Sequence, residues 1–373
     1  MTKSYKIVYA INADGFGHVT RSIPIIDHLL HKKHNIEIIT DKKVADFLQH
    51  KYKQLKIHIV PQVYFEYTND SVKAFKSFFK CFNKHNFNNL KKATLLIKKI
   101  KPDIVISDLE RYSLWGGKFL ELPTIEIDNH ATIFRGDVEF KQKDAADFLQ
   151  AKSVSKFVYP FANFYFGLCF YRTQITKKNT EVFDPIFLDD IKKYKAKDGD
   201  YILVYNRFMD KAKMVPTLKK IKNQKFVIFG YNVNKIDENL EFRKAKPNLF
   251  KEIAESKAII TNGGHTLITE AIYFKKPIYS IPIKHQFEQL TNAYYLEKLE
   301  YGLSTKKIDA INLRRFIKNI PYYKTKLEKH KYQDKKYFLK RLDEKINELI
   351  TESKTKLWFF LSGCFFVFCS FFF

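Results

Sequence analysis

Cysteine is scarce in this sequence, and no two cysteines are spaced as a metal-binding or redox pair. The chain has 373 residues, and its four cysteines are Cys81, Cys169, Cys364 and Cys369. None of them forms the C-x-x-C spacing of a zinc or redox site. A chain of this length buries about three quarters of its unfolded surface, so its fold requires neither a disulfide nor a structural metal. We therefore expect a reduced, cytoplasmic protein.

We also expect no secretory leader, because the residues after Met1 run into a short strand-like segment without a long apolar stretch. Acidic residues are few beside basic ones: 66 Lys and Arg oppose 40 Asp and Glu, which gives a net charge of +26. The excess charge is spread over the chain, and no nucleic-acid-binding motif accompanies it. We therefore expect no nucleic-acid partner and favour an anionic membrane surface, near which a lysine contributes about 1 kcal/mol.

The third glycine of a dinucleotide-binding G-x-G-x-x-G motif is missing. Segment 12–21 contains Gly15 and Gly17, but Thr20 stands at the third glycine position. This pattern argues against a nicotinamide-dependent dehydrogenase. The two glycines still allow the backbone to approach a ligand closely at a helix N-terminus. His18 is a candidate general base here, since imidazole titrates near neutral pH; alternatively, it only hydrogen-bonds the loop.

Short apolar runs alternate with helical patterns through the first half of the chain. The expected strands are 6–11, 36–40, 57–60, 103–107 and 124–127. Such alternation predicts a parallel sheet covered on both faces, with its ligand site at the carboxyl ends of the strands. The polar residues at these ends are Asn12, Thr40, Asp108 and Asp128.

The same pattern restarts after a polar stretch. Four further strands are expected at 201–205, 226–229, 258–261 and 278–281. The predicted fold class is therefore α/β, with two doubly wound Rossmann-like domains that face each other across a cleft. The expected boundaries are 1–183 for the N-terminal domain, 184–200 for the linker, 201–320 for the C-terminal domain, 321–356 for a basic helical extension and 357–373 for an apolar tail.

Two apolar segments suggest a membrane. The spacing of Phe75, Phe78, Phe79 and Phe82, with lysines between them, is typical of a basic amphipathic helix, unless these rings pack on the sheet. The tail 357–373 has no charged residue. As a helix it is about 26 Å long, just short of a hydrocarbon core of ~30 Å. A membrane-inserted tail, a buried terminal element and a tail foreign to the domain are the alternatives.

The strongest motif lies in the second half of the chain. An expected strand ends, Gly263 and Gly264 turn the chain, and a helix begins, which presents backbone amides to a diphosphate. Glu270 follows one and a half turns along that helix, where a carboxylate can accept both hydroxyls of a ribose. Polar side chains at the start of the next helix are expected to converge on the same crevice. Each residue alone is equally explained as a helix cap or surface group, but the whole string indicates a nucleotide site.

These motifs together resemble those of GT-B nucleotide-sugar glycosyltransferases, in particular the MurG or family-28 group and related archaeal and bacterial glycosyltransferase-like proteins. The resemblance covers residues 5–303, and the Lys-rich stretch beyond it and the Phe-rich tail depart from the family. The matching segments are Gly-Phe-Gly-His-x-x-Arg at 15–21, Pro-Asp at 102–103 with Asp108, Asp-Asn-His at 128–130, and the Asn-Gly-Gly-x-Thr…Glu-Ala…Lys-Pro…Glu-Gln-x-x-Asn-Ala string at 262–293.

The resemblance implies an acceptor-binding N-terminal domain, a donor-binding C-terminal domain, and catalysis in the cleft without a metal or cofactor. It implies that the turn residues hold the donor diphosphate, that Glu270 binds ribose, and that the next helix contacts the sugar or ribose. The implied donor residues are Asn262, Gly263, Gly264, His265, Thr266, Glu270, Glu288, Gln289 and Asn292, beside the loop residues Gly15, Gly17 and Arg21. The candidates for the base are, in order, His18, then Asp108 with Glu110, then His130.

The expected reaction is transfer of a hexosyl group from a nucleotide diphosphate sugar, with UDP-sugars favoured, to an acceptor hydroxyl. The resemblance implies inversion at the anomeric centre. The basic and apolar segments favour a lipid-linked or cell-envelope acceptor, reached at the inner face of the cell membrane. Two other functions stay open: a UDP-sugar 2-epimerase on the same fold, and a non-catalytic nucleotide-sugar-binding protein.

Overall fold

The structure is a computed structural model that describes residues 3–62, 84–158, 162–205, 210–244, 246 and 248–369. Side chains are described as far as residue 355, apart from those of residues 157 and 158. The amphipathic helix expected around Phe75–Phe82 lies outside the described residues.

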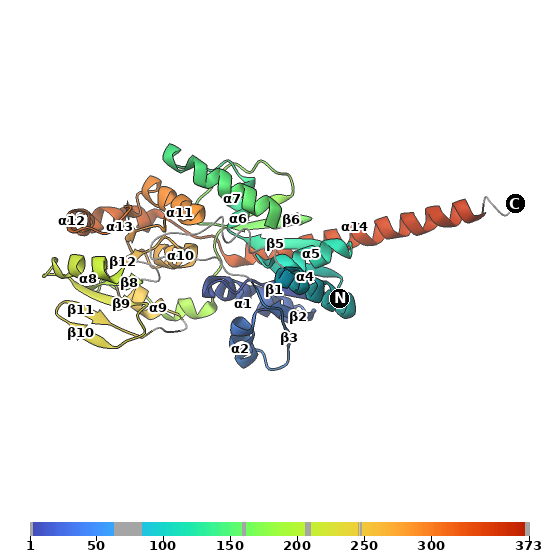
Figure 1. Cartoon of the computed structure of the whole chain (residues 1–373), viewed down its shortest axis with the longest axis horizontal. Helices are drawn as coiled ribbons and strands as arrows, with labels where there is room; N and C mark the ends of the chain where they lie inside the picture. Colours follow the sequence, from blue (N-terminus) through green and yellow to red (C-terminus); the bar gives the residue numbers. More distant parts are fainter. Residues whose placement is uncertain are drawn as a thin grey trace.

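The first half of the chain forms one parallel seven-stranded sheet with the order β3-β2-β1-β4-β5-β6-β7 (Figure 1). Its strands are β1 Lys6–Ile11, β2 Asn35–Thr40, β3 Lys56–Ile59, β4 Ile104–Asp108, β5 Thr124–Asp128, β6 Phe164–Leu168 and β7 Thr180–Phe183. The helices of this half are α1 Phe16–His31, α2 Lys42–Lys51, α4 Lys84–Ile100, α5 Arg111–Phe119, α6 His130–Arg135 and α7 Ala145–Val158.

Alternation along β1 explains the layers around this sheet. Ile7 and Tyr9 pack into one core with α1 and α2, whereas Val8 and Ala10 pack into another core with α4. Successive side chains of a strand point to opposite faces, so a strand that is apolar throughout is covered on both sides.

The second half forms another seven-stranded sheet with the order β10-β11-β9-β8-β12-β13-β14, parallel except for the β10–β11 pair. Its strands are β8 Tyr201–Tyr205, β9 Lys225–Phe229, β10 Lys235–Asp237, β11 Leu240–Phe242, β12 Ala258–Thr261, β13 Ile278–Ser280 and β14 Gly302–Ser304. The helices that follow them are α8 Lys211–Lys219, α9 Phe250–Ala254, α10 His265–Tyr273, α11 Phe287–Lys298, α12 Ala310–Lys318 and α13 Ile320–Lys329. The predicted α/β class with two Rossmann-like halves is therefore confirmed.

The C-terminal helix α14, Lys335–Cys369, leaves the second half and packs against the first (Figure 1). Phe338, Leu342, Ile346 and Ile350 recur every four residues, and all are buried in the core that contains β1 and α1. The Lys-rich segment expected as one basic extension is thus divided: α13 packs on the second half and α14 on the first. The far end of α14 projects beyond the rest of the molecule (Figure 1).

The expected linker contributes to the cores of both halves, and part of the first half joins the core of the second. Of segment 184–200, Ile186 is buried in the core of the first half and Ile191 in that of the second. Tyr171 stacks on Tyr295 of α11 with ring centroids 3.8 Å apart and planes inclined by 2°. The two halves therefore share an apolar interface beside their cleft, instead of only facing each other. Across the described residues, no helix combines the length and the apolar character that a bilayer crossing requires.

Candidate active site

A cavity of about 330 Å³ lies between the two halves. Loops at the carboxyl ends of β1, β4 and β5 form one wall, and those after β8, β12 and β13 form the other. The predicted site residues that line it are Gly15, Gly17, His18, Arg21, His130, Asn262, Gly264, His265, Thr266, Glu270, Glu288 and Gln289. The predicted residues absent from its lining are Asp108, Glu110, Gly263 and Asn292.

His18 lies in the first turn of α1, directly after the β1 loop, and a buried carboxylate holds its ring. Its Nδ1 is 2.7 Å from Oδ1 of Asp108, the last residue of β4. β1 and β4 are neighbours in the sheet, so their carboxyl ends bring these two residues together. Asp108 is fully buried, whereas the His18 side chain is 16% exposed and lines the cavity.

Arg21, one turn along α1, shares the carboxylate of Asp108 with His18. Its Nε donates to Asp108 Oδ2 at 2.7 Å, its Nη2 donates to Oδ1, and Ser22 Oγ donates to Oδ2 at 3.0 Å. Arg21 Nη2 also lies 2.7 Å from His18 Nδ1. Because a guanidinium only donates and a carboxylate only accepts, an Nδ1–H that points at Asp108 gives every group an acceptor. Nε2 then carries a lone pair, the form that a general base needs.

The structure corrects the prediction that Asp108 and Glu110 act as bases in the cleft. Burial alone would raise the pKa of Asp108, but the charges of Arg21 and His18 and their hydrogen bonds lower it. Glu110 is the N-cap of α5, and its carboxylate accepts from the backbone N–H groups of Tyr112 and Ser113 at 3.0 and 2.8 Å. Asp108 therefore orients His18, and Glu110 stabilises a helix end.

The N-termini of α1 and α10 meet at the cavity. Gly17 and Thr266 lie in the first turns of these two helices and both line the cavity. A Cβ atom at Gly17 would stand 2.3 Å from Thr266 Oγ1, so any larger residue here would force the Thr266 side chain to move. Helix N-termini carry unpaired N–H groups and partial positive charge, which together attract anions. Two of them at one cavity favour a doubly charged ligand such as a diphosphate.

Two glycines before α10 serve different purposes. Gly263 has a φ of +96°, a backbone conformation that L side chains rarely adopt. Gly264 has an ordinary φ of −63°, and a Cβ atom built on it would meet no atom within 4 Å. The open space at Gly264 belongs to the cavity. The absence of a side chain at Gly264 therefore leaves room for a ligand, whereas the packing of the fold does not require it.

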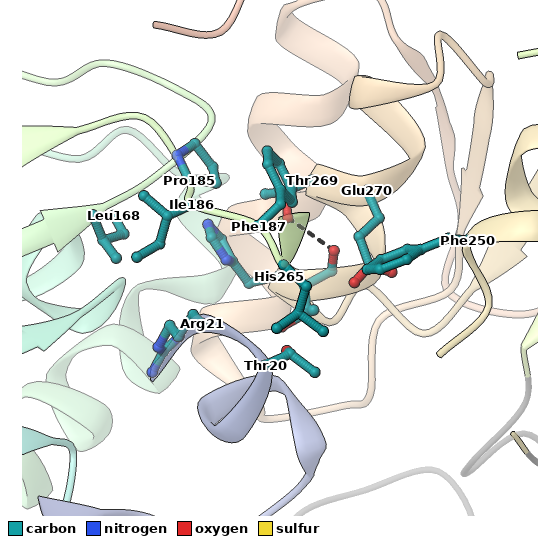
Figure 2. A pocket seen from close by; sticks show the side chains of 12 residues that line it. Thr20, Arg21, Leu168, Pro185, Ile186, Phe187, Phe250, His265, Thr269 and Glu270 are labelled. Carbon is teal, nitrogen blue, oxygen red and sulfur yellow. Dashed lines mark hydrogen bonds between the residues drawn. The ribbon is translucent and has the colours of Figure 1, made fainter. Parts of the chain in front are cut away.

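The side chain of Glu270 lies inside the cleft. It is 8% exposed, and burial alone raises the pKa of its carboxyl to about 8. Among the described residues, no hydrogen bond to its carboxylate is found. Figure 2 shows the adjoining small pocket, of about 20 Å³, where Thr20 and Arg21 of α1 lie across from His265 and Glu270 of α10. A buried carboxyl group that lacks a partner is suited to accept hydroxyl donors from a ligand.

His265 is neutral at physiological pH, because burial lowers its pKa to about 3. Its Nε2 is buried and has no hydrogen-bond partner in the described part of the chain. The donors that this position can offer a diphosphate are therefore its backbone N–H at the start of α10 and the single N–H of its neutral ring.

Three predicted donor residues form hydrogen bonds with the backbone of the loops around the cavity. Asn292 is fully buried and its Nδ2 donates to the carbonyl of Gly263 at 3.1 Å, so the prediction that it contacts the donor is corrected. Gln289 lines the cavity, but its Oε1 accepts from the backbone N–H of Ile283 at 3.0 Å. Asn262 Nδ2 reaches the Ile281 carbonyl at 3.4 Å. Sequence position alone did not reveal which way these side chains point.

Glu288 faces the cavity and binds residues of the opposite half. Asn129 Nδ2 donates to its Oε1 at 2.8 Å, and His130 Nε2 lies 3.2 Å from its Oε2. His130 is therefore engaged in an ion pair that joins the two halves, which does not fit its prediction as a base.

The sequence did not single out several other residues that line the cavity. Most of them lie beside a strand end or a helix start that the pattern did predict: Asp14, Phe16, Thr20, Leu109, Tyr205, Thr261, Leu267 and Gln286. Lys246, Asn248 and Leu249 lie before α9, which the pattern did not predict. Within the described ranges, no group of three or more His, Cys, Asp or Glu side chains is placed to hold a metal ion.

Comparison with known proteins places the chain in a family. Residues 5–321 match the model of glycosyl transferase family 1. An uncharacterised glycosyltransferase of Methanosarcina mazei is 23% identical over 385 residues, which covers 92% of this chain and 95% of the relative. Another from the same organism is 33% identical over 99 residues, and that match spans 26% of each chain.

Solved structures share the fold at low sequence identity. The glycotransferase of kitacinnamycin has a TM-score of 0.63 at 14% identity, with 95% of this chain and 98% of that chain covered. The glycosyltransferase SsfS6 of Streptomyces sp. SF2575, complexed with thymidine diphosphate, has a TM-score of 0.57 at 14% identity and coverages of 87% and 94%. The finer likeness to the MurG group is not confirmed by these matches. The chain belongs to glycosyl transferase family 1 and has the GT-B fold of these glycosyltransferases.

Proposed function

We propose that the protein transfers a hexosyl group from a nucleotide diphosphate sugar to an acceptor hydroxyl, with inversion and without a metal ion. One observation carries the proposal: the Asp108-bound His18 faces the same cavity as two helix N-termini and the unpartnered Glu270. A base, an anion site and a diol-binding carboxylate are the three elements that such a transfer requires.

The proposed step is a direct displacement. His18 Nε2 takes the proton of the acceptor hydroxyl as its oxygen attacks the anomeric carbon, and the bond from that carbon to the diphosphate oxygen breaks. Asp108 stabilises the imidazolium that forms. The leaving diphosphate keeps the electron pair, and the N–H groups at the starts of α1 and α10 stabilise its charge. Attack from the face opposite the leaving group inverts the anomeric centre.

The donor is proposed to bind mainly to the second half. Its diphosphate lies against residues 263–266, its ribose binds Glu270, and its sugar reaches Glu288 and Gln289. The thymidine diphosphate complex of SsfS6, a protein of the same fold, supports a nucleotide donor. Among such donors we favour UDP-sugars.

For the acceptor, we propose a lipid-linked or cell-envelope molecule that a cytoplasmic protein meets at the inner face of the membrane. The net charge of +26 supports attraction to anionic lipids. Co-sedimentation with vesicles of anionic or of neutral lipid tests this part: binding that is equal for both vesicles, or absent from both, contradicts it.

A ligand screen tests the donor. We expect one of the UDP-, GDP-, dTDP- or ADP-sugars to raise the melting temperature, since a ligand that binds only the folded state stabilises it. Binding of NAD with no response to any nucleotide sugar would overturn the proposal.

Incubation with the donor alone separates transfer from epimerisation. An epimerised sugar or a glycal would indicate a 2-epimerase, which needs acidic groups in the cleft of the first half. Asp108, Glu110, Glu126 and Asp128 are all at most 4% exposed and do not line the cavity, whereas Asp14 does, so D14N in the same assay shows whether this carboxylate supports epimerisation. Loss of activity in H18A with donor binding retained would argue against a purely binding role.

A further inference from the structure

Residues of the first half hold the carboxylate of Glu288 across the cleft. Besides the hydrogen bonds from Asn129 at 2.8 Å and His130 at 3.2 Å, Gln286 Nε2 donates to Oε2 at 3.3 Å. All four residues line the cavity. Two of the three groups that orient Glu288 thus belong to the half opposite its own.

The backbone presents this pair rigidly. Asn129 and His130 directly follow the fully buried strand β5, at the N-cap and first position of α6. Asparagine at an N-cap commonly accepts from the helix backbone, but the Asn129 side chain makes no such bond. Its amide is directed to Glu288 instead, and the side chain of Asn129 is almost fully buried, so its position is fixed by packing.

We infer that Asn129 and His130 are positioning residues for donor recognition: they fix Glu288 in the orientation that accepts a hydroxyl of the transferred sugar. The inference rests on the proposed function. An ionised carboxylate accepts in about four directions, and three are occupied here, which leaves one for a sugar hydroxyl. The sugar subsite is thus complete only when the halves are in contact, whereas the turn before α10 alone presents amides to the diphosphate.

The charges around His130 favour a charged pair. Burial lowers the pKa of His130, but the hydrogen bond and charge of Glu288, together with the charge of Asp128, outweigh burial and raise it. Arg21 opposes this rise. His265 of α10 also faces the pair and stays neutral at physiological pH. His130 therefore holds Glu288 most firmly while it is protonated, and the hold weakens as the pH rises through its raised pKa.

The test compares two ligands of one protein: the nucleoside diphosphate and the corresponding nucleotide sugar, titrated into wild type, N129A, H130A and H130Q. We expect N129A and H130A to bind the nucleotide sugar about tenfold more weakly, the effect of one hydrogen bond to a charged group. Binding of the nucleoside diphosphate should stay unchanged. H130Q keeps a donor and should retain part of the affinity, without the decline that wild type shows at alkaline pH. Equal losses for both ligands, or no loss for either, would overturn the inference.

E139Q is the matched control. Glu139 and Lys298 also form an ion pair between the halves, but this pair is exposed and lies outside the cavity lining. E139Q should leave both affinities unchanged. If wild type binds no nucleotide, the proposed function fails. A double-mutant cycle of H130A and E288Q, measured by denaturant unfolding, then tests the interaction between His130 and Glu288 separately. Changes in unfolding free energy that are not additive support an interaction between the two side chains, and additive changes refute it.

Discussion

The reactive side chains of the cleft depend on partners that are distant in the sequence. His18 and Asp108 are 90 positions apart, yet their side chains meet because β1 and β4 are neighbours in the sheet. The carboxylate of Asp108 is saturated by Arg21, Ser22 and His18. A substitution at Asp108 should therefore affect catalysis by changing the orientation and the tautomer of the His18 ring.

We predict that H18A lowers the rate of sugar transfer by about 10²- to 10⁴-fold, the usual contribution of a general base. Donor affinity should change little, because the diphosphate and ribose contacts stay in place. D108N should also lower the rate, since the amide no longer selects the Nδ1–H tautomer. Turnover and donor affinity are measured separately on each variant, and a fully active H18A would remove His18 from the mechanism.

Glu110 provides the contrast, as a carboxylate two residues from Asp108. We predict that E110A destabilises the protein by about 1 kcal/mol through loss of the α5 cap, with an unchanged transfer rate for the folded enzyme. Urea denaturation measures the first effect and turnover at low temperature the second. A strong loss of turnover in folded E110A would restore Glu110 as a base candidate.

Glu270 gives donor binding a pH dependence. Burial raises the pKa of its carboxyl to about 8, so the empty site holds it protonated at neutral pH. Ribose hydroxyls that donate to it favour the ionised form, so binding releases a proton. Affinity for a nucleotide sugar should therefore rise from pH 6 to about pH 8, by at most about tenfold per unit, until the loss of the proton from His130 lowers it at alkaline pH. Calorimetry across this range measures it, and E270Q should bind weakly with a flat profile.

The sequence predicted some residues of the cavity but not the direction in which every polar side chain points. The sequence could single out the glycines, His18 and Glu270 as cavity residues because each lies in a loop or near a helix start that follows a predicted strand. Glu110 and Asn292 share the same polar chemistry, but their side chains turn inward to a helix end and to a loop carbonyl. Only packing in three dimensions decides that direction.

At the scale of elements, the turn before α10 allows the anion site to be tested apart from the fold. We predict that G264A folds as wild type, because the φ of Gly264 suits alanine and the added methyl group meets no atom within 4 Å. The methyl group occupies ligand space, so affinity for a nucleoside diphosphate should fall at least tenfold. Thermal melting and calorimetry measure the two effects, and unchanged affinity would place the diphosphate elsewhere.

G263A and G17A are the controls for this turn. G263A strains a backbone at φ +96° and should cost about 1 kcal/mol of stability. G17A brings a methyl group against Thr266 and should disturb the contact between the halves.

The helices and strands that the sequence predicted well were those with polar residues at their ends. β1, β8 and β12 begin and end at the expected residues, and Asp41 caps α2 as its position at the end of β2 suggests. β6 was missed because it lies in a run of aromatic residues without a boundary signal, and β10, β11 and β14 have only three residues each. Short strands are set by their neighbours in the sheet and not by their own pattern.

For the whole molecule, α14 links the stability of the first half to residues near the other end of the chain. We predict that L342A lowers the free energy of unfolding by about 2–5 kcal/mol, since Leu342 is fully buried between α14 and the first sheet. Y337A, on the same helix but 61% exposed, should change it by less than about 0.5 kcal/mol. Urea denaturation of both variants makes the comparison, and equal effects would show that α14 does not complete this core.

The route of α14 also has a consequence for biosynthesis. A chain folds as it leaves the ribosome, and N-terminal domains generally fold first. Here β1 and α1 emerge early, yet Phe338, Leu342 and Ile346, which close their core, are translated only after the whole second half. The first sheet must wait, partly uncovered, until α14 has been made. A nascent chain stalled before α14 should therefore expose this sheet to chaperones and proteases.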